Sequence, residues 1–62
     1  MLNFNYLERK VQESPYTTIE ISELLGISRT TLFKYRKGNN IPSQNLDGLI
    51  KLLNLDLEQL FN

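Results

Sequence analysis

The chain has 62 residues, of which 40% are hydrophobic, and its seven basic and seven acidic side chains give a formal net charge of zero. This length allows one domain, residues 1–62, and the composition is that of a folded protein rather than a disordered one. The sequence contains neither cysteine nor histidine. Zinc sites, disulfides and the usual thiol or imidazole catalysis are therefore excluded, and we expect a protein that is not an enzyme and needs no cofactor.

A first helix is predicted to run to about residue 13. Three apolar residues recur in it at helical spacing: Phe4, Leu7 and Val11. Asn3 or Asn5 is suited to cap its start. Ser14 precedes Pro15, and a residue before proline is disfavoured in helical backbone. The helix should therefore stop at this point.

Residues 17–38 predict two short amphipathic helices joined by a tight turn. Thr17 followed by Glu20 has the spacing of a capping box, and Gly26 is suited to end the first of these helices. Ser28 can cap the second helix. The expected buried residues are Ile21, Leu24 and Leu25 in the first helix and Leu32 and Tyr35 in the second. Two helices joined by a short turn that contains glycine are typical of a helix-turn-helix.

Several residues of this stretch follow a known pattern: the turn Leu25-Gly26-Ile27-Ser28, the inner-face residues Thr31, Leu32 and Tyr35, and Gly38 followed by Pro42. Together with segment 52–61 they resemble the helix-turn-helix domain of the phage repressor and Cro family, also called XRE-type, over nearly the whole chain. The resemblance implies an all-α, compact five-helix bundle with a central helix-turn-helix, lambda-repressor-like or Cro-like. Its recognition helix, residues 28–37, would enter the DNA major groove.

The charges are unevenly distributed along the chain. Residues 24–46 contain four basic side chains and no acidic one, whereas the remainder holds three basic and seven acidic side chains. This asymmetry favours DNA binding through one positive surface, with modest non-specific affinity.

Candidate DNA contacts follow from the resemblance and from helical geometry. The predicted base-reading residues are Arg29, Thr30, Phe33 and Lys34. The predicted phosphate-binding residues are Thr17, Thr18, Ser28, Lys37, Asn39 and Asn40. Three alternatives remain open: Phe33 packs within the protein or in a dimer, Arg29 and Lys34 contact only phosphates, and the threonines only cap their helix.

Position 36 departs from the family pattern. The family usually has a glutamate here that pairs with an arginine on the first helix, whereas this chain has Arg36. Either Glu8 or Glu13 pairs with Arg36 in a swapped arrangement, or Arg36 is free to contact DNA.

The C-terminal third predicts two more helices. Ser43 should cap the fourth helix, whose apolar stripe is Leu46, Leu49, Ile50 and Leu53. Asn39 or Asn40 before it, and Asn54 after it, are suited to left-handed backbone. Asp56 with Gln59 resembles a capping box for a last helix, residues 57–61.

The tail is more apolar than one small core requires, so its surplus side chains lie either beneath the first helix or in a dimer seam. The resemblance favours the seam, formed by Leu55, Leu57 and Phe61. A homodimer, weak in solution, would bind a near-palindromic operator whose half-sites are about 34 Å apart.

The sequence therefore predicts a sequence-specific double-stranded DNA-binding regulator, a Cro-like repressor of a phage or mobile element. We expect it in the cytoplasm of a bacterial or phage-infected cell, associated with the nucleoid, with no membrane segment and no small-molecule effector. Two alternatives stay open: a protein-interaction module that has lost DNA binding, and an excisionase-like recombination factor. The excisionase alternative requires a wing strand after Pro42, where the sequence predicts a helix.

Overall fold

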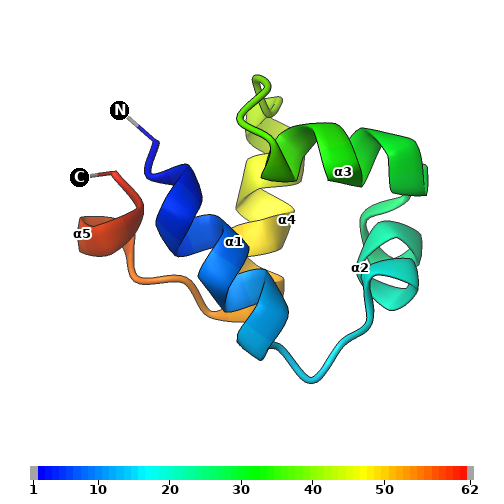
Figure 1. Ribbon diagram of the computed structural model, residues 1–62, viewed down its shortest axis with the longest axis horizontal. Coiled ribbons are helices and arrows are strands. Elements are labelled where there is room, and N and C mark those ends of the chain that lie inside the picture. The colour runs from blue at the N-terminus through cyan, green and yellow to red at the C-terminus, as the bar shows by residue number, and fades with distance from the viewer. Residues whose placement is uncertain (1, 62) are drawn as a thin grey trace.

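The computed structural model describes residues 2–61, which form five helices and no strand (Figure 1). The helices are α1 (Phe4–Glu13), α2 (Thr18–Leu25), α3 (Arg29–Arg36), α4 (Ser43–Leu53) and α5 (Leu57–Leu60). The prediction of a compact all-α fold with five helices is confirmed. Helix α4 occupies the segment after Pro42, so an excisionase-type wing strand is not present there.

Side-chain caps fix the starts of the first three helices, as the sequence predicts. The Asn3 side chain accepts a hydrogen bond from the Tyr6 N–H at 3.1 Å, whereas Asn5 lies inside α1. Thr17 and Glu20 form both halves of a capping box, and Ser28 accepts from the Thr31 N–H at 3.0 Å. These bonds satisfy N–H groups that have no partner within their own helix.

The loop before α4 differs from the prediction in two respects. Residue Ser43 is the first helical residue and not the cap; Pro42 holds the cap position and makes no side-chain cap bond, because a proline ring has no hydrogen-bond acceptor. Neither Asn39 nor Asn40 has a positive φ; Gly38 takes the left-handed conformation at φ 100°. The Asn39 side chain instead donates to the Lys34 carbonyl at 3.0 Å.

The C-terminal turn follows the prediction in part. Asn54 is left-handed, with φ 53°, as expected. Asp56 caps α5 by accepting from the Glu58 N–H at 3.1 Å, but Gln59 does not complete a capping box. Its amide donates to the Asp56 carboxylate, and the Asp56 N–H instead donates to the Tyr6 hydroxyl at 2.8 Å. This bond ties α5 to α1.

Each helix contributes one almost inaccessible side chain to the core: Leu7, Ile21, Leu32, Leu49 and Leu60. The prediction for α2 is wrong at Leu24, whose side chain is 61% exposed. Ser22 is buried instead, and its hydroxyl donates to the Ile19 carbonyl at 2.8 Å. Because Ser22 faces the core, α2 is rotated about its axis and Leu24 is carried outward.

The anchoring of α5 can be tested by shortening its buried leucine. Leu60→Ala should lower the free energy of unfolding by about 2–5 kcal/mol, because it leaves a cavity where the side chain is 0% exposed. Leu57→Ala, in the same helix but at an exposed position, should change it by less than about 0.5 kcal/mol. Urea unfolding followed by circular dichroism measures both values. Equal losses would contradict the assignment of Leu60 to the core.

Candidate nucleic-acid interface

Helix α3 is attached to the protein by one face and exposes the other. Leu32 and Tyr35 are buried on its inner face, and the Tyr35 hydroxyl accepts a hydrogen bond from the Asn45 side chain at 2.9 Å. The four predicted base-reading residues are all exposed on this helix: Arg29, Thr30, Phe33 and Lys34. The structure therefore brings them together on one element, which packs mainly on α2 and α1 and is also tied to α4 by the Asn45–Tyr35 hydrogen bond.

An aromatic ring stands on the exposed side of α3. The Phe33 side chain is 56% exposed and is not part of the hydrophobic core cluster. The Lys37 ammonium lies 5.2 Å from the ring centroid, within the range of a cation–π contact. Lys37, predicted as a phosphate ligand, is thus placed beside a predicted base-reading residue.

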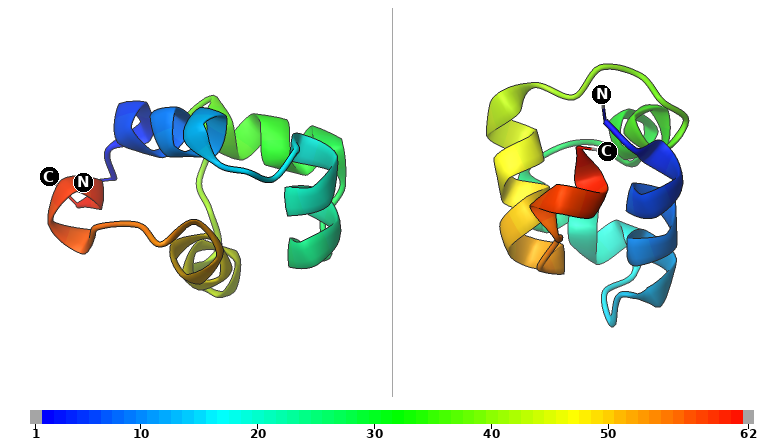
Figure 2. Two further views of the ribbon diagram at one scale, coloured as in Figure 1. Left: turned by 90° about the horizontal axis from the view of Figure 1, so that it is seen from below. Right: turned by 90° about the vertical axis from the view of Figure 1, so that its left-hand side faces the viewer.

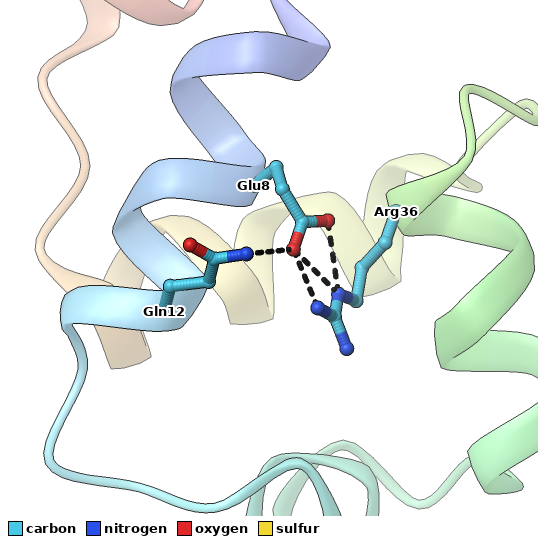
Figure 3. A network of polar contacts seen from close by, with 3 residues as sticks. All are labelled: Glu8, Gln12 and Arg36. Carbon is cyan, nitrogen blue, oxygen red and sulfur yellow. Dashed lines mark hydrogen bonds and ion pairs between the residues drawn. The ribbon is translucent and has the colours of Figure 1, made fainter.

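An ion pair joins α1 to α3 (Figure 3). The Arg36 Nε donates to both carboxylate oxygens of Glu8, at 3.2 and 3.0 Å, and its Nη2 also donates to Oε1. The Gln12 amide donates to the same Oε1 at 3.2 Å. Arg36 lowers the pKa of Glu8, and the Glu8 carboxylate raises that of Arg36, chiefly through these hydrogen bonds. Of the predicted alternatives, the swapped pair with Glu8 is therefore present.

A surface hollow of about 520 Å³ lies between α1 and α3. Its lining includes Phe33, Arg36 and Lys37 from α3, and also Asn5 and Gln12 from α1. Neither amide is among the predicted contact residues, and Asn5 was expected only as a possible helix cap. Asn5 is three residues before Glu8 and Gln12 is four residues after it, so all three side chains lie on one polar stripe of α1. This spacing could have identified the two amides once Glu8 was paired with Arg36.

Three of the predicted phosphate ligands are already engaged in capping. The Thr17 N–H and hydroxyl bond to Glu20, the Ser28 hydroxyl bonds to Thr31, and the Asn39 amide bonds to the Lys34 carbonyl. Thr18 and Asn40 are exposed, and no side-chain hydrogen bond ties them to the described part of the chain. Thr18, Lys37 and Asn40 are thus the members of this set best able to bind an added phosphate.

The helices that carry most of the predicted contacts begin on one side of the molecule. In Figure 2 (left), α1, α3 and the first turn of α2 lie on the same side, and α4 lies on the other. The start of α2, at Thr17 and Thr18, therefore lies toward the side on which α3 is found.

The predicted dimer seam is only partly exposed. Leu57 and Phe61 are 53% and 50% exposed. Leu55 is 7% exposed and belongs to the core, so its assignment to the seam is wrong. The reason is the left-handed Asn54, after which the Leu55 N–H donates to the Ile50 carbonyl at 3.0 Å and the side chain turns inward.

Within residues 2–61, no three or more acidic side chains lie close enough together to hold a metal ion. None of the helices described here has the length and hydropathy needed to cross a bilayer. Comparisons with protein-family models, curated protein sequences and solved structures gave no match.

The ion pair predicts a pH dependence of stability. Because the folded-state pKa of Glu8 is below its ordinary value of 4.5, the pair stabilises the fold fully above that pH, and its contribution is lost as the pH falls below it. Glu8→Gln should cost about 0.5–1 kcal/mol at pH 6, and this cost should shrink as the pH falls below 4.5. Urea unfolding at several pH values measures the difference. A difference that is independent of pH would contradict the assignment.

Proposed function

We propose that this protein binds double-stranded DNA sequence-specifically, as a Cro-like transcriptional regulator of a phage or mobile element. The observation that carries the proposal is α3 itself. Its inner face is fixed by Leu32 and Tyr35, while the side chains predicted to read bases project outward. A rigid helix with a polar and basic exposed face is what major-groove reading requires.

Each exposed residue of α3 has a chemical role in this proposal. Arg29, at the first position of the helix, donates two hydrogen bonds to a guanine, and Thr30 bonds a neighbouring base edge. Phe33 contacts a thymine methyl group, and the Lys37 ammonium lies beside its ring within cation–π range. Lys34 contacts the edge of a base. The Glu8–Arg36 pair holds the end of α3 against α1.

The backbone contacts in this proposal come from Thr18, Lys37 and Asn40, while Thr17, Ser28 and Asn39 maintain the helix ends beside them. With so few basic ligands, affinity for generic DNA is modest. A weak homodimer through Leu57 and Phe61 then joins two half-sites of a near-palindrome. Control comes from the concentration of the protein in the cytoplasm and from overlap of the operator with a promoter.

A second candidate function is a protein-interaction module without DNA binding. The formal net charge of zero favours it, as do the exposed apolar side chains of Leu24, Leu57 and Phe61. Selection of sites from a random duplex pool at low salt distinguishes the two. Recovery of a short palindrome supports the DNA-binding regulator, whereas no enrichment by the folded protein supports the interaction module.

Substitution of Arg29 tests the proposed reading helix. Arg29→Ala should relax the base preference at one operator position and weaken operator binding by about 1–3 kcal/mol, because a bidentate contact is lost. Lys51→Ala, which removes a positive charge from α4, should have little effect. Site selection with both variants measures the preference. An unchanged preference for Arg29→Ala would refute its role as a reader.

Substitution of Lys37 should produce a different effect. Lys37→Ala should weaken binding to all duplex sequences by a similar factor. Because one phosphate contact is lost, the slope of log affinity against log salt concentration should also decrease by about one. Fluorescence anisotropy with an operator and with a scrambled duplex, over a range of salt concentrations, measures both effects. A loss confined to the operator would assign Lys37 to base reading.

A further inference from the structure

The capping box of α2 places a carboxylate at the end of the helix that attracts anions. The Glu20 Oε1 accepts from the Thr17 N–H at 2.8 Å, and the Glu20 N–H donates to the Thr17 hydroxyl at 3.1 Å. The N-terminus of a helix carries partial positive charge and free N–H groups, which favour a phosphate or a carboxylate. In this chain a carboxylate of the protein already holds that position.

This carboxylate differs from the acidic side chain held between α1 and α3. Glu8 is neutralised by Arg36, whereas Glu20 is exposed and has no ion pair within the described residues. The first turn of α2 lies on the same side of the molecule as α3 (Figure 2, left). A duplex bound along α3 would thus bring its phosphates toward a carboxylate that has no basic side chain beside it in the described residues.

We infer that Glu20 acts as an electrostatic restraint on duplex binding: its carboxylate weakens the phosphate contact proposed for Thr18 at the start of α2. The inference depends on the proposed function and identifies a residue that shapes its specificity. Because phosphate contacts are the same for every sequence, weakening one lowers non-specific affinity. Recognition then depends more strongly on the base contacts of α3.

The variant that isolates the charge is Glu20→Gln. A glutamine at this position of a capping box can still accept the Thr17 N–H, so the helix start is kept while the charge is removed. The matched control is Glu58→Gln, which removes an exposed carboxylate from α5. Helices α5 and α2 lie at opposite ends of the molecule in Figure 1. Glu20→Ala is also neutral but lacks the capping oxygen, so it separates charge from helix capping.

The experiment measures affinity for a mixed-sequence duplex by fluorescence anisotropy from low to high salt. Glu20→Gln should bind about two- to fivefold more tightly than the wild type near 50 mM salt, and the gain should shrink as salt rises. Glu58→Gln should bind as the wild type does. Glu20→Ala should share the gain in affinity but unfold at a lower temperature.

The possible failures are distinguishable. Salt-dependent binding by the wild type, with no difference between Glu20→Gln and Glu58→Gln, would overturn the restraint and leave the proposed function intact. A gain for Glu20→Gln that is absent in the equally neutral Glu20→Ala would also overturn it, because the charge would not be the cause. No binding by any folded variant would overturn the proposed function and the inference with it.

Discussion

The structure depends on the burial of one side chain from every helix at a common centre. A chain of this length can bury only about 60% of its unfolded surface, so no helix has a core of its own. Leu32 holds α3 to this centre and Leu60 holds the four-residue helix α5. The orientation of the exposed face of α3 therefore depends on the packing of all five helices.

Polar contacts between distant segments supplement this small core. The Tyr6 hydroxyl accepts from the Asp56 N–H, the Asn3 N–H donates to the Leu60 carbonyl at 2.7 Å, and Asn45 donates to the Tyr35 hydroxyl. Each bond satisfies a group that would otherwise lose its contact with water. The Glu8–Arg36 pair has another consequence, since it neutralises a carboxylate beside the proposed DNA-binding face.

Helix capping and phosphate binding compete for the same groups in this chain. A short polar side chain at a helix start can satisfy its own backbone or an external anion, and the box at Thr17 and Glu20 shows the first outcome. In the restraint inferred above, the Glu20 carboxylate also repels a phosphate that approaches this helix start. In the proposed function, zero net charge and a basic α3 thus combine weak attraction to the DNA backbone with exposed groups that read bases.

The sequence by itself determined the helices and most of their ends, because capping signals such as Thr17 with Glu20, and glycine at 26, act within a few residues. It also predicted which residues α3 exposes. Only the tertiary structure decided the rotation of α2, the burial of Leu55 and the choice of Glu8 as the partner of Arg36. These features depend on how separate helices pack against one another, and residue spacing within one helix carries no information about its neighbours.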